Sequence, residues 1–247
     1  MKSTYETSSA LAEYLAFHYL EPAALLPRDL RPPFQIRNFP KSCAQILLTE
    51  ARRRKIRPHR ALDLGCAVGR ASFELARTVP EVVGVDFSKS FVRTAQTLSQ
   101  RGSIRFRMKS EGALSEPAQA RLVPPSIGKR VCFRAGDALH LAPLGMFDLV
   151  LAANLVDRVG DPKKLLQKVL PSLVGPGGLL LLTSPYTWSR EFTPSSRWLK
   201  DSFPVIRKLL LPHFRLIRRK NLPFLLREHR RKFQLTFADA TLWLRRG

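Results

Sequence analysis

The pattern Asp63-x-Gly65-x-x-x-Gly69 places an acid and two glycines where a strand gives way to a helix. The apolar residues 61–64 predict the end of a buried strand, and residues 71–76 resume with helical spacing. The glycines allow a sharp turn and a close approach of the backbone to a ligand, because neither carries a Cβ atom. Such a turn is typical of the first strand-to-helix connection in a nucleotide-binding α/β sheet.

The spacing separates this turn from the dinucleotide pattern G-x-G-x-x-G. Cys66 follows Gly65, and the next glycine comes only at Gly69. The pattern D-x-G-x-x-x-G, with an acid on the preceding strand, is similar to the S-adenosylmethionine (AdoMet) motif of class I methyltransferases. Asp63, Gly65, Cys66, Ala67 and Gly69 are therefore predicted to contact AdoMet. An ordinary tight connection between strand and helix is the alternative.

A second acid ends the next predicted strand, residues 81–86. In Rossmann-like sheets an acid about 20 positions beyond the glycine turn accepts hydrogen bonds from both ribose hydroxyls, and Asp86 occupies that position. Asp86 is also placed to cap the following helix, residues 88–100, and the two roles are compatible. We predict that Asp86 binds ribose and that its neighbour Phe87 belongs to the cofactor site.

Further polar residues follow the third predicted strand, residues 131–134, and the fourth. By resemblance to methyltransferases of this type, Asp137 is placed to contact the adenine amino group and Ala138 to lend a backbone donor. A surface turn is the alternative for Asp137. Asn154 and Asp157 border the crevice at the carboxyl edge of the fourth strand, so they are candidates for the cofactor and reacting site.

The order of elements predicts one α/β domain: a Rossmann-like class I methyltransferase with a seven-stranded, mostly parallel sheet and an antiparallel last strand. Residues 1–55 are expected to form an N-terminal helical cap with helices at 5–20 and 41–54. Residues 56–247 form the AdoMet-dependent methyltransferase domain, with an insertion at about 101–130. The other expected segments are a proline-rich connection at 22–40, the fourth strand at 146–152, a helix at 162–170, a turn at 175–178, the fifth strand at 179–182, the last two strands at 214–217 and 240–244, and a charged segment at 223–234 between them.

Composition bounds the remaining functions. The chain has 42 Lys and Arg against 19 Asp and Glu, a net charge of +23, which favours contact with nucleic acid or an anionic membrane surface. An arginine-rich solvated surface explains the charge equally well. Three scattered cysteines argue against a disulfide framework or a zinc site and suit a reducing cytoplasm. We see no signal peptide and no apolar run near the roughly 20 residues that span a bilayer, so we expect a soluble, cytoplasmic protein without a metal.

Several segments together resemble one narrow family. It is the methyltransferase that forms the C-terminal part of ovothiol synthase and also occurs as a free-standing 4-mercaptohistidine N1-methyltransferase. The matching segments are Tyr5-Glu6, 14–19, 38–40 with Cys43, 63–70, 154–158 with Asp161-Pro162, 184–188, 227–228 and 231–234. The resemblance spans nearly the whole chain. The chain departs from the family in its arginine excess, and it is too short for the iron-dependent sulfoxide synthase part.

This resemblance implies that AdoMet methylates a ring nitrogen of 5-thiohistidine (4-mercaptohistidine) to give ovothiol A. A carboxylate hydrogen bonded to the second ring nitrogen would fix the tautomer and offset the developing positive charge, and Glu228 and Asp157 are the acids expected there. Tyr186 or Trp188 is expected as an aromatic wall. The other predicted substrate residues are cations for the substrate carboxylate and residues of the N-terminal region: Arg231, Lys232, His18, Tyr19 and Asn38. For His18, simple packing on a helix face is the alternative.

A different class of function is nucleic-acid binding, as an RNA or DNA methyltransferase or a basic Rossmann-like module. Three basic clusters, residues 52–60, 101–109 and 215–220, could contact phosphates. Against this, residues 154–157 read Asn-Leu-Val-Asp and lack the N/D-P-P-Y/F pattern associated with methylation of base amino groups. A catalytically silent scaffold is the third alternative. We favour a small-molecule methyltransferase with thiohistidine as its partner.

Overall fold

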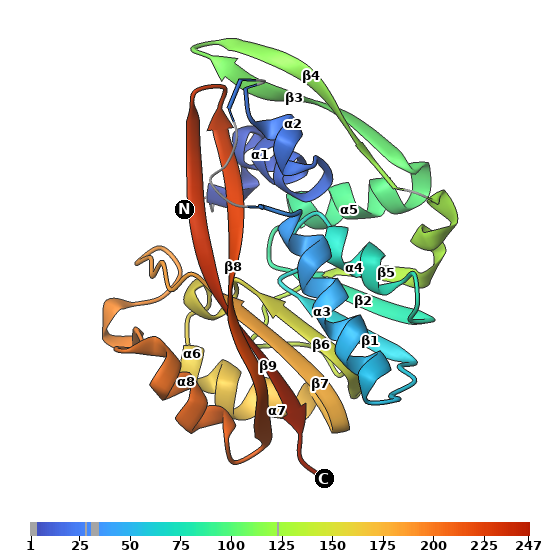
Figure 1. Ribbon diagram of the computed structural model, residues 1–247, viewed down its shortest axis with the longest axis vertical. Helices are drawn as coiled ribbons and strands as arrows, with labels where there is room; N and C mark the ends of the chain where they lie inside the picture. The colour runs from blue at the N-terminus through green and yellow to red at the C-terminus, as the bar shows by residue number, and fades with distance from the viewer. Residues whose placement is uncertain (1–3, 28, 31–34, 123) are drawn as a thin grey trace.

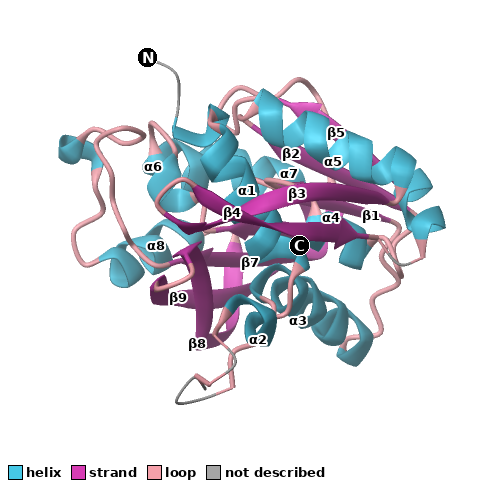
Figure 2. Ribbon diagram, turned by 90° about the horizontal axis from the view of Figure 1, so that it is seen from above, coloured by secondary structure: helices cyan, strands magenta, loops and turns pink. Residues whose placement is uncertain are grey.

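The computed structural model describes residues 4–27, 29–30, 35–122 and 124–247. The predicted proline-rich connection lies partly outside these ranges. A seven-stranded sheet carries helices on both faces, and a two-stranded sheet lies over one end of the molecule (Figure 1). The view from above in Figure 2 shows this small sheet crossing over α1.

The larger sheet has the strand order β5-β2-β1-β6-β7-β9-β8, with parallel pairing from β5 to β7 and antiparallel pairing of β9 to both neighbours. This confirms the predicted fold, including the antiparallel last strand. Its strands are β1 Arg60–Leu64, β2 Glu81–Asp86, β5 Val131–Ala135, β6 Phe147–Ala153, β7 Val174–Ser184, β8 Phe214–His229 and β9 Lys232–Arg245; the smaller sheet pairs β3 Ser103–Glu111 with β4 Leu114–Arg121.

The helices lie in two layers. They are α1 Ser8–Tyr19, α2 Pro22–Leu25, α3 Phe39–Arg53, α4 Arg70–Leu75, α5 Lys89–Arg101, α6 Pro162–Lys164, α7 Leu170–Leu173 and α8 Ser202–Leu210, with a π-helical turn at Leu165–Val169 and short 3-10 turns at Thr4–Glu6, Pro125–Arg130, Val156–Arg158 and Ser195–Arg197. Alternate residues of a strand point to opposite faces, so Ala61 joins the core beneath α3 to α5, and Leu62 joins the core beneath α6 to α8. No helix among the described residues is long and apolar enough to cross a membrane.

The C-terminal hairpin is much longer than predicted. The sequence predicts two short strands separated by a charged segment at 223–234. The structure instead has two long strands, β8 and β9, which pair from Phe214↔Arg245 to His229↔Lys232. Leu222, Phe224 and Leu225 are buried, because the far half of β8 packs against α1, α3 and β3. The polar residues of the segment therefore lie along a hairpin that extends beyond the main sheet.

Three other predicted segments differ in detail. The predicted helix at 162–170 is interrupted by the π-helical turn and continues to Leu173. The predicted turn at 175–178 lies within β7, where the register shifts between Phe147 and Leu149 of β6. The predicted insertion at about 101–130 forms the hairpin β3–β4. Strand β4 contains Pro117, which is tolerated because an edge strand leaves one side of its backbone unpaired.

The N-terminal region contributes to two different parts of the fold. Helix α3 packs against α4, β6 and β7 and so belongs to the central layers, whereas α1 packs against β3, β4 and β8. Asn38 joins the two: its Oδ1 accepts a hydrogen bond from Lys41 N at 3.1 Å, and its Nδ2 donates to His18 O at 2.9 Å. The structure thus gives Asn38 a capping role at the start of α3.

Asn38→Ala is expected to lower the free energy of unfolding by about 1–2 kcal/mol, because the start of α3 and the end of α1 both lose a buried partner. Urea denaturation measures the change. Asn221→Ala, at an exposed asparagine of β8, is the matched control and should have little effect. Equal free energies of unfolding for the two variants would contradict the capping role of Asn38.

Candidate active site

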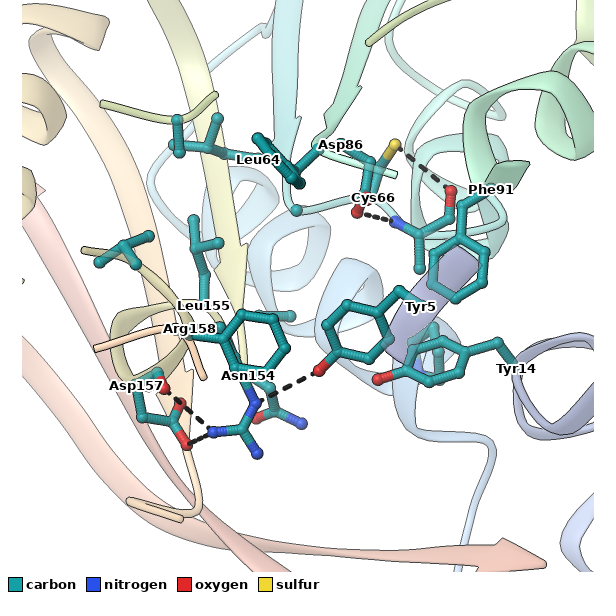
Figure 3. Close-up of a pocket in the computed structure, with 18 of the residues that line it drawn as sticks. Tyr5, Tyr14, Leu64, Cys66, Asp86, Phe91, Asn154, Leu155, Asp157 and Arg158 are labelled. Carbon is teal, nitrogen blue, oxygen red and sulfur yellow. Dashed lines mark hydrogen bonds and ion pairs between the residues drawn. The ribbon is translucent and has the colours of Figure 1, made fainter. Parts of the chain in front are cut away.

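A cavity of about 420 Å³ lies at the carboxyl ends of the parallel strands. Its walls include Leu64 at the end of β1, Asp86 at the end of β2 and Ala153 at the end of β6. Tyr14 and His18 of α1 line it as well. Open α/β sheets bind ligands at this edge, so the cavity is the candidate active site (Figure 3).

The glycine turn forms one wall of this cavity. Gly65 and Gly69 have φ angles of 82° and 85°, in the left-handed region that favours glycine. A Cβ atom on Gly69 would lie 2.6 Å from Phe133 Cζ, and one on Gly65 would lie 3.2 Å from Leu155 Cδ1. The turn therefore needs glycine for both conformation and space.

Asp86 connects this turn to the next helix. Its Oδ2 accepts a hydrogen bond from Ala67 N at 2.8 Å, and its Oδ1 accepts one from Ser88 N at 2.9 Å. Ser88 is the N-cap of α5, through its hydroxyl oxygen and Phe91 N. Each carboxylate oxygen of Asp86 can still accept a second hydrogen bond, as contact with the two ribose hydroxyls requires. Burial raises the pKa of Asp86 to about 6.

Two buried groups lie behind the turn. Asp63 accepts a hydrogen bond from Ser72 Oγ at 2.6 Å, and burial raises its pKa to about 7. Burial also raises the pKa of the Cys66 thiol well above its ordinary value, so this cysteine stays protonated. Both residues line the cavity.

The cavity lining also includes Phe87, predicted for the cofactor site, and Asp137 and Ala138, predicted for adenine. Phe87 is 70% exposed and lines the cavity, so one ring face is available for stacking. Asp137 and Ala138 lie on the same cavity. The Asp137 carboxylate accepts a hydrogen bond from Leu139 N at 2.9 Å and contacts His140 Nδ1 at 2.8 Å. The Asp137 carboxylate oxygens can accept further hydrogen bonds, which suits the adenine amino group.

Asn154, Asp157 and Arg158 form another part of the wall, across the cavity from Asp86 in Figure 3. Asp157 is fully buried; it accepts hydrogen bonds from Ser184 Oγ at 2.9 Å and from Arg158 Nη1 at 3.0 Å. Burial raises the pKa of the Asp157 carboxyl, and the Arg158 charge opposes this rise. Asn154 has a φ angle of 51° and its Oδ1 accepts a hydrogen bond from Thr183 Oγ1 at 2.9 Å.

Several predicted substrate residues lie outside the cavity. Glu228 pairs with Lys232 at 2.7 Å and accepts a hydrogen bond from Gln234 at 2.8 Å, so the structure does not bring this acid to the reacting end. Arg231 and Lys232 are exposed at the turn of the β8–β9 hairpin. The two predicted cations are therefore not placed beside Asp157.

The predicted aromatic walls also have other partners. The Tyr186 hydroxyl donates to Asp239 Oδ2 at 2.7 Å, and Trp188 stacks on Trp198 with 6.5 Å between ring centroids. The Tyr19 hydroxyl donates to Val68 O at 2.7 Å. His18, by contrast, does line the cavity; it is 6% exposed, and burial lowers its pKa to about 3, which keeps the ring neutral.

The observed aromatic wall comes from residues to which the sequence analysis gave no site role. Tyr5 stacks on Phe192 at 5.2 Å and meets Tyr14 edge-on at 5.6 Å, and Tyr14 lies 4.8 Å from Phe91. Arg158 Nε donates to the Tyr5 hydroxyl at 3.3 Å. Adjacency in sequence was a signal for Arg158, which lies in the segment 154–158 with Asn154 and Asp157, whereas Tyr5 lies in a matching segment without a predicted site residue.

Comparison with known families identifies the central segment. Residues 62–180 match the family model of a methyltransferase domain. A norajmaline N-methyltransferase from Rauvolfia serpentina is 28% identical over 156 residues, and a ubiquinone biosynthesis O-methyltransferase from Azorhizobium caulinodans is 29% identical over 132 residues. These matches cover 62% and 53% of this chain but only 44% and 42% of those proteins.

Solved structures share the fold. The magnesium protoporphyrin IX methyltransferase ChlM from Synechocystis PCC 6803, with bound S-adenosyl-L-homocysteine, has a TM-score of 0.61 and 18% identity, with 98% of this chain and 97% of that chain covered. The N-methyltransferase NodS from Bradyrhizobium japonicum WM9, also bound to S-adenosyl-L-homocysteine, has a TM-score of 0.55 and 14% identity, with 97% and 99% covered.

The fold is the one that class I methyltransferases share, and residues 62–180 match a methyltransferase domain, so both support AdoMet as the cofactor. The cavity fits that molecule. The glycine turn leaves the backbone open, Asp86 offers acceptors for the ribose hydroxyls, and Phe87 and Asp137 suit adenine. Among the described residues, no group of three or more His, Cys, Asp or Glu side chains could hold a metal ion.

The affinity for S-adenosylhomocysteine is expected to weaken as the pH falls through about 6, because protonation of Asp86 removes a charged acceptor for the ribose hydroxyls. Asp86→Asn should bind more weakly at pH 8 and lose part of the pH dependence; Asp63, with a pKa of about 7, accounts for the remainder. Calorimetry between pH 5 and pH 8 measures both. A flat wild-type profile would contradict the ribose role.

Proposed function

We propose that this protein transfers a methyl group from AdoMet to a ring nitrogen of 5-thiohistidine. The fold, the methyltransferase domain match and the resemblance of its motifs to the mercaptohistidine methyltransferases support the proposal. The two curated relatives are named as N- and O-methyltransferases, which fits a heteroatom as the acceptor. The observation that carries it is one cavity shared by the cofactor wall at Asp86 and the buried Asp157.

When bound, AdoMet supplies a methyl group already activated by its sulfonium. The protein has to orient the acceptor, exclude water and manage one proton. We assign that proton to Asp157, and three observations support this: its carboxylate is buried, is fixed by Ser184 and Arg158, and has acceptor capacity toward an imidazole N–H. A hydrogen bond from that N–H would fix the tautomer and leave the lone pair on the other nitrogen free to attack.

The aromatic residues around Asp157 suit a flat acceptor. Tyr5, Tyr14, Phe91 and Phe192 line the same cavity and form a chain of ring contacts between 4.8 and 5.7 Å. A planar ring can pack against such a wall, and the wall keeps water from the reacting atoms. Figure 3 shows Tyr5 and Tyr14 facing the space next to Asn154 and Arg158.

The direct test incubates the purified protein with AdoMet and, in parallel, thiohistidine, histidine or total RNA. Mass spectrometry then identifies the species that gains a methyl group. We expect methylated thiohistidine. Methylated RNA without methylated thiohistidine would overturn the substrate assignment.

RNA is included because one surface favours it as the second candidate. Arg105, Arg107 and Lys109 alternate along β3 and are exposed, so their side chains share one face of the small sheet. A row of cations with this spacing can contact a phosphate backbone. Salt-sensitive RNA binding without transfer to thiohistidine would favour this second function.

Asp157→Asn is expected to lower turnover on thiohistidine by about 100-fold or more, because the amide carries no negative charge to offset the positive charge that develops on the ring and cannot take its proton. Glu228→Gln should leave turnover unchanged, since Glu228 pairs with Lys232 outside the cavity. Single-turnover assays measure both, and S-adenosylhomocysteine binding checks that each variant folds. An equal change in turnover for the two variants would contradict the role of Asp157 as the acceptor of the ring proton.

A further inference from the structure

The charged side chains around the cavity are very unequal in sign. Its described lining includes five acids, Asp63, Asp86, Asp137, Asp157 and Glu191, whereas Arg158 is the one lysine or arginine among those residues. His18 also lines it, and burial keeps that ring neutral. An anionic group on an acceptor therefore has one side chain of opposite charge to meet. The excess of arginine elsewhere in the chain does not reach this cavity.

Arg158 is held in a fixed orientation. Its Nη1 donates to Asp157 Oδ2 at 3.0 Å and to the carbonyl oxygen of Thr187, and its Nε donates to the Tyr5 hydroxyl at 3.3 Å. The guanidinium carbon lies 5.6 Å from the centre of the Phe192 ring. Such fixation reduces the conformational entropy that ligand binding would otherwise cost.

One guanidinium nitrogen remains for a ligand. Arg158 Nη2 makes no hydrogen bond to the residues that the structure describes, and 24% of the side chain is exposed. A guanidinium has five N–H donors, and the two on Nη2 suit a carboxylate oxygen. Asp157 does not take this place, because its Oδ2 accepts from Nη1 and its Oδ1 accepts from Ser184 Oγ.

The neighbours of Arg158 indicate which kind of ligand would present a carboxylate to it. Tyr5 and Phe192 stack at 5.2 Å with 20° between their planes, and both line the cavity beside the guanidinium. Asp157 lies next to Arg158 in the chain and on the same wall. An aromatic amino acid would thus find an acceptor for its ring N–H, a wall for its ring and a cation for its carboxylate within one region.

We propose that Arg158 binds the carboxylate of an amino-acid acceptor and so selects the carboxylate-bearing substrate over its decarboxylated amine. This subsite rests on the proposed methyl transfer and replaces Arg231 and Lys232 as the carboxylate partner. Two anchors, Arg158 and Asp157, then set which ring nitrogen faces the methyl group. The competing ligand for Arg158 is the carboxylate of the cofactor itself, at the methionine end.

The test compares thiohistidine with the corresponding thiol-bearing imidazole ethylamine, which lacks the carboxylate. Arg158→Met removes a partner of Asp157 and is therefore expected to lower kcat/KM for both acceptors, but by about 10- to 100-fold more for thiohistidine, since only that acceptor also loses a charge-assisted hydrogen bond to its carboxylate. Arg158→Lys should recover part of the difference. Arg190→Met is the matched control, because Arg190 is exposed and lies outside the cavity.

The outcomes separate the alternatives. Equal losses for both acceptors would show that Arg158 acts only through Asp157 or the fold, and would overturn the subsite. A matching loss of S-adenosylhomocysteine affinity would assign Arg158 to the cofactor. If the wild type methylates neither acceptor, the thiohistidine assignment fails. Titration of the S-adenosylhomocysteine complex with histidine and with histamine then decides the subsite: tighter binding of histidine that Arg158→Met abolishes supports it, and equal binding overturns it.

Discussion

The hydrogen bonds accepted by Asp86 hold the cofactor half of this site together. Its two oxygens accept hydrogen bonds from Ala67 N in the glycine turn and from Ser88 N at the start of α5, so one half-buried carboxylate at the end of β2 links the turn after β1 to the start of α5. The left-handed angles of Gly65 and Gly69 bring the turn close enough for this contact. Everything else in the site is placed against this edge, because parallel strands all present their carboxyl ends there.

The second half of the site depends on a contact between distant parts of the chain. Tyr5, before α1, meets Arg158, after β6, and the rings of Tyr14, Phe91 and Phe192 pack around that pair. The N-terminal segment thus supplies part of the cavity wall. Asp157 remains buried beside Arg158, which compensates its charge in a region of low dielectric.

The cofactor half was predictable because its signals are local: glycine spacing, an acid at a strand end and the order of strands and helices all act within a few residues. Arg158 was not assigned, since its importance arises from packing against Tyr5, 153 positions away. The resemblance to the mercaptohistidine methyltransferases predicts Glu228 at the reacting end, on a charged segment at 223–234. In the structure Glu228 lies on strand β8, which extends beyond the main sheet and is held there by the buried Leu222 and Phe224. Alternation of polar and apolar residues in a long edge strand is a weak signal when prolines and charges interrupt it.

The measurement that tests the account most directly follows the methyl group itself. AdoMet carrying a carbon-13 label in its methyl group is incubated with the protein and thiohistidine, and the product is examined by through-bond NMR correlation. We expect one new N-methyl resonance that correlates with imidazole ring carbons and requires Asp157. A label that stays on AdoMet, or that appears on sulfur, would contradict it.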